Sequence, residues 1–383
     1  MEFTHRSVRK HFIERFKKEP ILVRSPGRIN LIGEHTDYND GFVMPAAIDK
    51  EIIFAIAPSN DKTSKLFSLN FNELFEIDLL NPQPVSNPGW ANFLLGVVRQ
   101  FVDRKLPLTP FNCVFGGNIP AGSGLSSSAA LECGFGFALQ ELNAFKISKP
   151  ELAKIGQWSE HNFVGVRCGI MDQFANMMGK ENHVIQLDCR SMEYQYLPID
   201  LSNHALVLFN SGVKHSLASS EYNVRRNECE EGIKILKVKS LRDVSIADLQ
   251  NKRYEFRDDH VYDRCKYIVE EIERVQQASA DLKRGDLFSF GKRMFETHEG
   301  LSNQYQVSCE ELDYLVSMTR EKPEVLGARM MGGGFGGCTI NIVRQSSVDD
   351  IVDSLRSSYY KRFRIDAESY VVQITGGTNL ISA

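Results

Sequence analysis

The sequence predicts an α+β fold with two domains. Short apolar runs of the kind found in strands occupy 21–25 and 52–57, on either side of a dense polar loop. Beyond Cys189 the chain changes to a strand-like run followed by long charged helical segments. Strands and helices that are segregated along the chain favour α+β over a regular α/β alternation. The length of 383 residues fits two domains of about 150 residues each, and we divide the chain into 1–193 and 194–383.

The first predicted helices carry clear start signals. The turn-rich stretch 81–89 precedes an amphipathic helix. The apolar stripe of this helix consists of Phe93, Leu94, Val97, Val98 and Phe101. A second helix opens at 148–151, a capping-box pattern with Pro150 in the first turn, and should run to about Phe163.

Later elements are marked in the same way. The sequence Ser-Cys-Glu-Glu over 308–311 is another capping box and predicts the start of a late helix. Apolar runs predict strands over 205–209 and 370–374. The glycine-rich stretch 332–337 precedes the strand-like run 338–343, which indicates a tight glycine turn between two strands.

Composition and charge limit the function classes. The chain is 42% hydrophobic and 25% charged, enough to bury a sizeable core. Its net charge of −4 argues against nucleic-acid binding, which relies on clustered Lys and Arg. The N-terminal segment is charged and lacks an apolar region, and no apolar run approaches the ~18 residues of a membrane span. We therefore expect a cytoplasmic monomer without a signal peptide or a membrane partner.

The eight cysteines are scattered, without a CxxC pair and without histidines at metal-ligand spacing. Such spacing indicates neither a zinc site nor a disulfide framework. Several of the cysteines, including Cys133 and Cys229, stand in apolar or helical surroundings. The expected state is reduced and mostly buried thiols, as in a cytosolic protein.

A glycine- and serine-rich loop precedes a helix-forming run within 117–139. Gly122, Gly124 and three serines lie directly before the helix. Glycines let backbone N–H groups approach an anion, and a helix start adds unpaired donors and the positive end of its dipole. Serine hydroxyls here can cap the helix or ligate Mg²⁺. Taken alone, the loop leaves phosphate binding and a flexible turn before a capped helix equally open.

The usual phosphate signatures are absent. The chain contains neither GxxxxGK[ST] nor the HRD and DFG motifs, which excludes a P-loop enzyme and a protein kinase. Residues 332–337 formally match GxGxxG, but a dinucleotide-binding fingerprint needs a helix after it, and here a strand-like run follows. A Rossmann fold is therefore not predicted.

A second polar loop lies between two strand-like runs, within 25–41. Its polar side chains are Arg28, Glu34, His35, Asp37, Tyr38 and Asp40. Donors and acceptors at this density suit a polyhydroxylated ligand, because each sugar hydroxyl needs a placed partner. The alternative is a solvated loop with an Asx turn over 39–41. A metal site at His35 is not expected, since a single histidine between acids is usually a hydrogen-bonded loop residue.

Two carboxylates stand out in the segment 159–179. Glu160 lies late on the predicted helix, and Asp172 sits in an otherwise apolar stretch. A carboxylate among apolar neighbours must be paired or have a shifted pKa, which is how catalytic bases are placed. The local sequence explains Asp172 equally well as the N-cap of a short helix. His161 can likewise be a structural histidine.

Taken together and in this order, three glycine-bearing segments resemble the family of galactokinase, homoserine kinase, mevalonate kinase and phosphomevalonate kinase. LSSSA over 125–129 and GGGFGG over 332–337 are elements of the whole family. The block GRINLIGEHTDYNDGFVMP over 27–45 resembles the more specific galactokinase signature. MDQF, LDCRS and SLASSEYNVRR (216–226) add to the resemblance, which runs from about residue 20 to the C-terminus.

This resemblance implies an N-terminal half like ribosomal protein S5 and a ferredoxin-like C-terminal half, with the active site between them. It also implies transfer of the γ-phosphoryl group of ATP to the C1 hydroxyl of α-D-galactose, the first step of galactose catabolism. Galactose and ATP are then the expected partners, and Mg²⁺ is the expected cofactor.

The family motifs also imply roles for single residues. The sugar hydroxyls are expected to be held by Glu34, His35, Asp37, Tyr222 and the backbone of Gly169. Arg28 and Asp172 flank the reacting hydroxyl, with Asp172 as the base that accepts its proton. The ATP phosphates are expected to be bound by Gly122, Ser123, Gly124, Leu125, Ser126, Ser127 and Ser128. Ser128 and Glu160 are the expected Mg²⁺ ligands, and Ser68 is expected near the nucleotide.

Two other functions stay open. A kinase for a related sugar, such as N-acetylgalactosamine or arabinose, would carry the same motifs. A galactokinase-like sensor that binds sugar and ATP to signal to a partner would be favoured by the loss of a catalytic element, but none of the catalytic and metal-binding residues named above is missing.

Overall fold

The computed structural model describes residues 3–214 and 218–381. In these residues the strands form three sheets, of six, four and three strands, and helices pack around them. Strands and helices are grouped along the chain rather than alternating regularly, so the predicted α+β class is confirmed. No helix in the described ranges is long and apolar enough to cross a membrane.

The six-stranded sheet belongs mainly to the first half of the chain and has the strand order β13-β1-β3-β6-β4-β5. Its neighbours pair antiparallel, except β4 and β6, which are parallel. The strands are β1 (Ile21–Asn30), β3 (Pro45–Pro58), β4 (Ser64–Ser68), β5 (Glu73–Ile77), β6 (Phe111–Gly117) and β13 (Asn379–Leu380).

Helices cover both faces of this sheet. Side chains alternate between the faces along a strand, so Ile53 and Ala55 of β3 pack with Val8 and Phe12 of α1, while Phe54 packs on the opposite face. That opposite face is covered by α2 to α5. The helices of this half are α1 (His5–Phe16), α2 (Ala91–Asp103), α3 (Ser127–Asn143), α4 (Lys149–Ser159) and α5 (Met171–Met178).

The four-stranded sheet has the order β10-β11-β9-β12 and is antiparallel throughout. Leu206 and Leu208 of β9 pack with α8 and α9 on one face, and Val207 and Phe209 pack with α10 and α11 on the other. The elements are β9 (His204–Lys214), β10 (Val325–Met331), β11 (Gly336–Arg344), β12 (Glu368–Val372), α8 (Asp259–Lys283), α9 (Leu287–Glu299), α10 (Glu310–Arg320) and α11 (Val348–Phe363).

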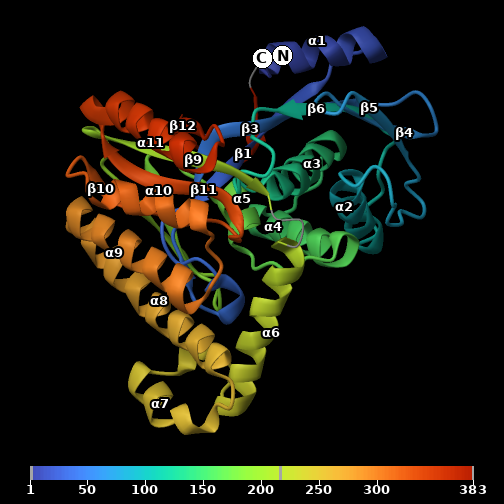
Figure 1. Ribbon diagram of the computed structural model, residues 1–383. Helices are drawn as coiled ribbons and strands as arrows, with labels where there is room; N and C mark the ends of the chain where they lie inside the picture. The colour runs from blue at the N-terminus through green and yellow to red at the C-terminus, as the bar shows by residue number, and fades with distance from the viewer. Residues whose placement is uncertain (1–2, 215–217, 382–383) are drawn as a thin grey trace.

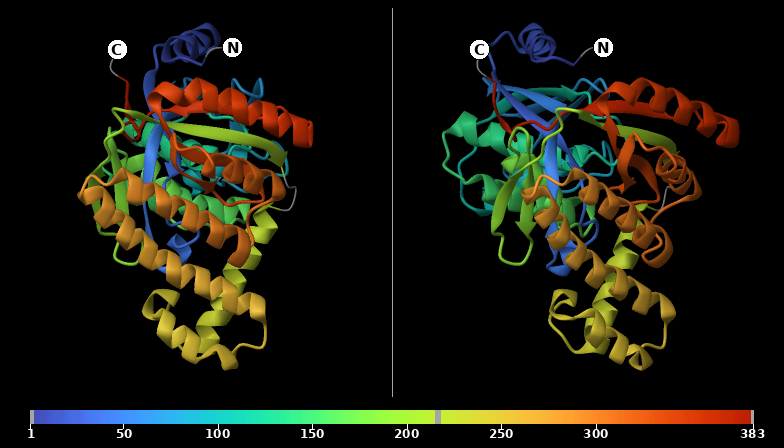
Figure 2. Two further views of the ribbon diagram at one scale, coloured as in Figure 1. Left: turned by 60° about the vertical axis from the view of Figure 1, so that its left-hand side comes forward. Right: turned by 90° about the vertical axis from the view of Figure 1, so that its left-hand side faces the viewer.

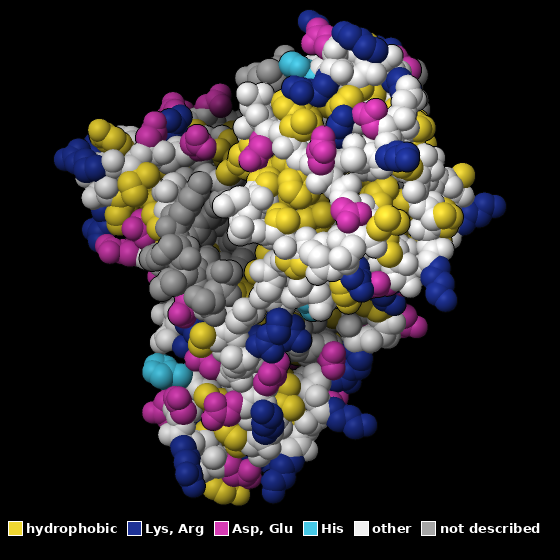
Figure 3. Space-filling view, turned by 90° about the vertical axis from the view of Figure 1, so that its right-hand side faces the viewer, with side chains coloured by type: hydrophobic (Ala, Val, Ile, Leu, Met, Phe, Trp, Pro, Cys, Tyr) yellow, Lys and Arg dark blue, Asp and Glu magenta, His cyan; other side chains and the backbone are white. Residues whose placement is uncertain are grey.

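A helical projection extends below the two larger sheets (Figures 1 and 2). It consists of α6 (Ala218–Leu236), α7 (Ile246–Asn251) and the first part of α8. Its apolar cluster continues into the main body at Tyr305 and Met330. The remaining sheet joins β2 (Phe42–Val43) to β7 (His183–Asp188) and β8 (Tyr194–Pro198). Figure 3 shows acidic and basic side chains interspersed over the projection, while hydrophobic side chains gather on the upper body.

The C-terminal segment returns to the first sheet. Leu380 of β13 pairs with Val23 of β1, and Ile374 forms a bridge with Ile48. The N-terminal helix α1 and this last strand therefore lie on the same side of the molecule (Figure 1). A division between 193 and 194 separates β7 from β8, which pair with each other, whereas the four-stranded sheet begins only at β9. The boundary between the two domains stays a prediction.

Most local predictions agree with the structure. The predicted stripe lies on α2, and Ser148 caps α4 by accepting a hydrogen bond from the Glu151 N–H. Helix α4 ends at Ser159 and continues as a π-helical turn over Glu160–Val164. The predicted capping box at 308–311 is wrong. Cys309 is the N-cap of α10 and has no side-chain capping bond, because the Asp313 N–H bonds to the Cys309 carbonyl and sets the helix start there.

Candidate active site

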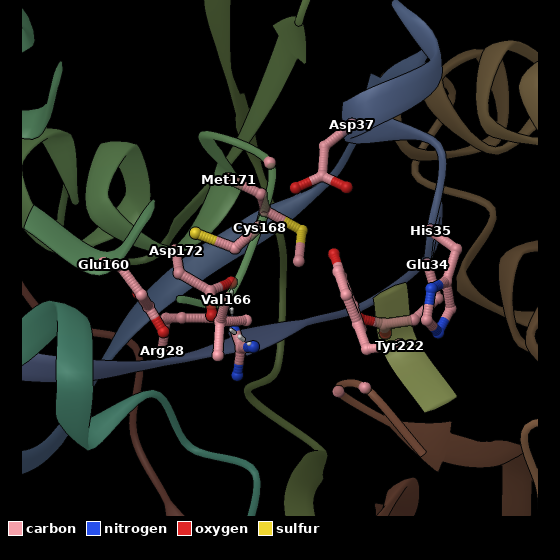
Figure 4. Close-up of a pocket in the computed structure, with 13 residues that line it drawn as sticks. Arg28, Glu34, His35, Asp37, Glu160, Val166, Cys168, Met171, Asp172 and Tyr222 are labelled. Carbon is pink, nitrogen blue, oxygen red and sulfur yellow. Dashed lines mark hydrogen bonds and ion pairs between the residues drawn. The ribbon is translucent and has the colours of Figure 1, made fainter. Parts of the chain in front are cut away.

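The residues predicted for the sugar and for catalysis line one cavity of about 130 Å³ between the two halves of the molecule. In Figure 4 the side chains of Arg28, Glu160 and Asp172 lie at one end, and those of Glu34 and His35 lie at the other. Strand β1 contributes Arg28, and the loop after it contributes Glu34, His35 and Asp37. The other residues come from segments far away in the sequence. Folding therefore brings together all of the predicted sugar-binding and catalytic residues.

Arg28 and Asp172 form a bidentate ion pair. Arg28 Nε lies 2.7 Å from Asp172 Oδ1, and a second guanidinium nitrogen lies 2.9 Å from Oδ2. The third nitrogen of Arg28 donates to the Gly124 carbonyl at 2.5 Å, and the Ser126 hydroxyl donates to Asp172 Oδ2. Burial opposes the charge of Arg28, but Asp172 and Glu34 raise its pKa above the ordinary value, so the guanidinium stays charged.

Asp172 lies in the first turn of α5, whose N-cap is Ile170. The alternative that Asp172 is the N-cap of this helix is therefore wrong. Its carboxylate instead points toward Arg28 and Ser126, with a quarter of its side chain exposed to the cavity. A carboxylate held in this way is oriented and still open to a ligand.

The loop 122–128 lines a second cavity of about 250 Å³, which shares Arg28 and Asp172 with the first. Gly122 and Gly124 have φ of +72° and +73°, a region that favours glycine, and Ser126 at +58° ends the loop before α3. These residues place the start of α3 against the cavity, where helix N–H groups suit an anion. The Ser123 hydroxyl is not directed at the cavity, because it donates to the Pro120 carbonyl at 2.7 Å.

Ser128 and Glu160, the predicted metal ligands, lie close to each other. Burial raises the pKa of Glu160 to about 7, and Asp172 adds to that effect, while a hydrogen bond with Ser128 opposes it. The Gln173 amide donates to Glu160 Oε2 at 2.9 Å and to Glu132 Oε2 at 3.1 Å, which orients Glu160 from behind. No group of three or more His, Cys, Asp or Glu side chains in the described parts of the chain is arranged to hold a metal ion.

At the sugar end, Asp37 faces Gly169. Desolvation, with Asp172 and Glu34 nearby, raises the pKa of Asp37 to about 7. A Cβ atom on Gly169 would lie 1.8 Å from Asp37 Oδ2, so only glycine lets the two segments approach this closely. Tyr222 also lines the cavity. The first two residues of its predicted motif, 216–226, lie outside the described residues.

Glu34 is held by a residue that the sequence analysis did not select. Arg329, on β10, is fully buried and lies 2.5 Å from Glu34 Oε2. The guanidinium also donates to the carbonyls of Leu31 and Asn30. Arg329 lies three residues before the glycine-rich turn, but its local sequence carries no signal that it would meet a carboxylate in the loop after β1.

A third and mainly apolar cavity of about 600 Å³ adjoins the phosphate loop, with Pro120 and Ser127 in both walls. Ser68 lines this cavity and not the cavity of Arg28 and Asp172. The aromatic side chains in its lining are Phe3, Phe71, Trp90, Phe93 and Phe115. These aromatic residues stand in four separate segments of the chain, so the sequence offers no local motif for them.

Other predicted features take structural roles. His161 lies in the π-helical turn after α4, and its Nε2 lies 2.7 Å from the Cys168 carbonyl, so this histidine has a structural hydrogen bond. All eight cysteines are free thiols, and five of them are buried. The glycine stretch 332–337 is the turn between β10 and β11, as predicted, and its Gly332 and Gly333 reach the sugar cavity.

Comparisons with known proteins match this arrangement. The model of the galactokinase galactose-binding signature matches residues 10–58. The models of the GHMP kinase N-terminal and C-terminal domains match residues 92–180 and 278–361. The galactokinase of Thermotoga maritima is 42% identical over 94% of this chain and 99% of its own length. This chain belongs to the galactokinase family.

Further relatives agree with membership in the galactokinase family. The galactokinase of Fusobacterium nucleatum is 38% identical over 97% of this chain and 98% of its own length. The crystal structure of Lactococcus lactis galactokinase complexed with galactose matches with a TM-score of 0.95 and 33% identity, over 98% of this chain and 99% of that one. Mevalonate kinase from Methanococcus jannaschii shares the fold, with a TM-score of 0.69 and 19% identity, over 94% of this chain and 100% of that one. The chain is therefore an ATP-dependent sugar kinase with the predicted two-part small-molecule kinase fold.

Proposed function

We propose that this enzyme transfers the γ-phosphoryl group of ATP to the C1 hydroxyl of α-D-galactose, giving galactose 1-phosphate and ADP. The supporting observation is the position of the Arg28–Asp172 pair in the wall between the sugar cavity and the cavity of loop 122–128. A sugar in the first cavity and a phosphate in the second would meet at this pair. Galactose is the substrate that the galactokinase relatives support.

In the proposed reaction, Asp172 accepts the proton of the C1 hydroxyl as its oxygen bonds to the γ-phosphorus. The bond between that phosphorus and the oxygen leading to ADP breaks, and the proton ends on Asp172. Arg28 holds both oxygens of Asp172 and places a positive charge beside the transferred group. Positioning and charge stabilisation account for most of the catalysis in phosphoryl transfer. The amides of 122–128 and the start of α3 would bind the phosphates.

The residues at Ser128 and Glu160 fit Mg²⁺. A hydroxyl and a carboxylate are hard oxygen ligands, and Mg²⁺ usually takes one or two protein ligands besides phosphates and water. Mg²⁺ bound there would neutralise charge on the phosphates of ATP. Glu160→Gln removes one anionic ligand, so we propose that more Mg²⁺ is needed for half-maximal activity, while the affinity for galactose changes little.

The apolar cavity suits the adenine base, and this completes the proposed ATP site. Its aromatic lining offers stacking surfaces of the kind that nucleobases use. Ser127 is shared with the phosphate cavity, so a base here would be joined to phosphates at loop 122–128. Ser68 would then contact the nucleoside rather than the phosphates.

The proposed sugar site makes a specificity prediction. Glu34, His35 and Asp37 would pair the hydroxyls that distinguish galactose from glucose, and glucose would leave a buried group unpaired at its inverted C4. Sites that pair a hydroxyl reject an analogue without it by roughly 10⁴-fold. Glucose should therefore be a very poor substrate.

The test is a coupled ATPase assay over a panel of galactose, glucose, N-acetylgalactosamine and arabinose, with the phosphorylated product identified by ³¹P NMR. Galactose should have the highest kcat/KM and give a 1-phosphate. Comparable kcat/KM for glucose and galactose would contradict the proposal. Sugar and ATP binding without turnover would favour the sensor. The predicted monomeric state and cytoplasmic location stay predictions, and sedimentation addresses the first.

A further inference from the structure

A buried chain of hydrogen bonds runs from the sugar cavity into the core behind His35. His35 Nδ1 lies 2.8 Å from the Tyr38 hydroxyl, which lies 2.7 Å from the Tyr305 hydroxyl. The Tyr305 hydroxyl lies 3.3 Å from Cys229 Sγ, and Asn39 donates an amide N–H to the same sulfur at 3.7 Å. Tyr305, Cys229 and Asn39 are buried, so solvent does not reorient the inner groups of this chain.

His35 is uncharged in these surroundings. Burial, together with the cations Arg225 and Arg329, lowers its pKa to about 3. A neutral imidazole carries one N–H, on Nδ1 or on Nε2, and the bond made by one nitrogen decides what the other offers. Nε2 is buried beside the Gly333 backbone but forms no hydrogen bond of normal geometry with any residue that the structure describes. His35 is one of the residues that line the sugar cavity, so a ligand bound there would lie beside its imidazole.

The hydrogens of this chain can be arranged in two directions. In the first, His35 Nδ1–H donates to Tyr38, Tyr38 donates to Tyr305, and Tyr305 donates to Cys229. The sulfur of Cys229 then accepts from both Tyr305 and Asn39, and the thiol hydrogen has no acceptor among these hydrogen-bonded groups. In the second, the thiol of Cys229 donates to Tyr305, Tyr305 donates to Tyr38, and Tyr38 donates to Nδ1.

The second direction is the more favourable one. Every hydrogen between His35 Nδ1 and the Cys229 thiol has an acceptor in it, whereas the first direction leaves the thiol hydrogen without one, and a buried donor without an acceptor is costly. The N–H that the second direction places on Nε2 lies beside the Gly333 backbone. In the second direction the two tyrosine hydroxyls, which are the strongest donors, donate to an oxygen and to an imidazole nitrogen. In the first direction the Tyr305 hydroxyl donates to sulfur, which is a weak acceptor. In the second direction Nδ1 is an acceptor, so the single N–H of His35 lies on Nε2.

We propose that Tyr38, supported by Tyr305 and Cys229, fixes His35 as the tautomer protonated on Nε2 and so makes His35 a hydrogen-bond donor toward the sugar. This inference rests on the proposed function, since it concerns the same cavity. Tyr38 is then a positioning residue that acts through His35. A fixed donor at this point selects a ligand oxygen with a free lone pair and is ready before the sugar arrives, so binding does not require a tautomer change.

The tautomer can be measured in the free enzyme. Long-range ¹H–¹⁵N correlation spectra of enzyme with labelled histidine distinguish protonated from unprotonated ring nitrogens, and the His35 signals are those lost in His35→Gln. We expect the Nε2–H pattern in the wild type and a mixture of both tautomers in Tyr38→Phe, which removes the donor to Nδ1. An Nδ1–H pattern in the wild type, or an unchanged spectrum in Tyr38→Phe, would overturn the proposal.

Kinetics supply the second readout. Tyr38→Phe should raise the KM for galactose on the order of 10-fold, the size of one hydrogen bond, with little change in the KM for ATP. Tyr359→Phe is the matched control, because it removes a buried tyrosine hydroxyl that donates to the Ser211 carbonyl at 2.8 Å, away from the cavity. That control should lower the melting temperature without changing the KM for galactose. An equal KM for galactose in Tyr38→Phe and the wild type would overturn the proposal.

The same experiments separate this inference from the proposed function. The spectra need no sugar, so they report on the tautomer whatever the substrate is. If His35 has the Nε2–H pattern and responds to Tyr38→Phe while the wild type does not phosphorylate galactose, the proposed substrate is wrong and the tautomer assignment stands.

Discussion

At the scale of the residue, three carboxyl groups of one cavity differ because their partners differ. Asp172 has Arg28 on both of its oxygens, and Glu34 has the buried Arg329. Asp37 accepts backbone N–H bonds from Tyr38 and Met171 and forms no ion pair with any residue that the structure describes, so desolvation dominates and its pKa rises to about 7. The acid with the strongest cationic partner is the one proposed as the base, and Asp37 is suited to share hydrogens with a neutral sugar.

Asp172→Asn tests the base. The amide keeps the shape of the side chain but cannot accept the hydroxyl proton, so we expect kcat to fall by roughly 10²–10⁴-fold, the usual contribution of such a group. Galactose and ATP should still bind, which calorimetry measures on the same sample. A variant that keeps more than half of the wild-type kcat would remove Asp172 from this role.

Asp37→Asn tests the raised pKa through stability. The pKa of Asp37 is about 7 in the folded protein, and the ordinary value of 3.8 applies in the unfolded chain. Between pH 3.8 and about pH 7 the folded protein therefore keeps a proton on Asp37 that the unfolded chain has released. The contribution of Asp37 to stability therefore falls as pH rises from about 4 to about 7. The asparagine lacks this penalty, so the variant should be more stable than wild type at pH 8, on the order of 2 kcal/mol, and equally stable near pH 4.

Urea unfolding of both proteins at the two pH values measures this difference. Asp200→Asn is the control, because a hydrogen bond from the Ser202 N–H lowers the pKa of the exposed Asp200. Its substitution should have the opposite sign and cost a little stability at pH 8. If the stability difference between Asp37→Asn and the wild type does not change with pH, the pKa of Asp37 is not raised in the folded protein.

At the scale of the element, the site depends on close approaches between backbone segments. The segment before α5 places Gly169 directly against Asp37, and the turn between β10 and β11 meets the phosphate loop at Gly332, whose added Cβ would lie 3.3 Å from the Gly124 carbonyl. The first approach leaves no space for a side chain, and the second would make a tight contact with one. They join the start of α5, the loop after β1 and the start of α3 into one cavity wall.

Gly169→Ala tests the first of these approaches. The new methyl group would collide with the Asp37 carboxylate, which can move, so the fold should persist while the sugar site is displaced. We expect kcat/KM for galactose to fall on the order of 10-fold or more, because small misplacements near the reacting groups have large effects. The KM for ATP should change little. Gly376→Ala is the matched control, since open space surrounds that glycine; equal losses in both variants would contradict the argument.

At the scale of the whole molecule, the site lies where the two sheets are joined. A single apolar cluster includes Ile29 and Ile48 from the first sheet and Leu208 and Ile340 from the second. Arg329 crosses the same junction from β10 and bonds to carbonyls at the end of β1. The junction therefore sets the distance between the loop after β1 and the rest of the cavity.

Arg329→Met tests this link. It leaves the carboxylate of Glu34 buried without its cation, which usually costs roughly 3–5 kcal/mol of folding free energy. We expect both a lower melting temperature and a higher KM for galactose. Arg356→Met breaks an exposed pair with Asp366, worth about 1 kcal/mol or less, and serves as the control. Similar melting temperatures for the two variants would show that the buried pair does not stabilise the junction.

Much of the fold could be read from local patterns in the sequence. The stripe of α2, the Ser148 cap of α4 and the glycine turn after β10 all depend on residues close to one another in the chain, and each is present. The capping box at 308 failed because the helix starts one residue later, at Cys309, whose carbonyl accepts the backbone bond from the Asp313 N–H although its side chain forms no cap. The return of β13 to β1 also had no local signal.

The sequence by itself determined the family motifs, the helix starts and which polar residues would be present at the site. Only the tertiary structure decided which of them meet. Arg28 and Asp172 are 144 residues apart in the chain, and Arg329 and Glu34 are 295 apart. The physical reason is that local conformational preference acts over a few residues, whereas the partner and the burial of a charged side chain depend on how distant segments pack. The partner and the burial then set the charge state of that side chain.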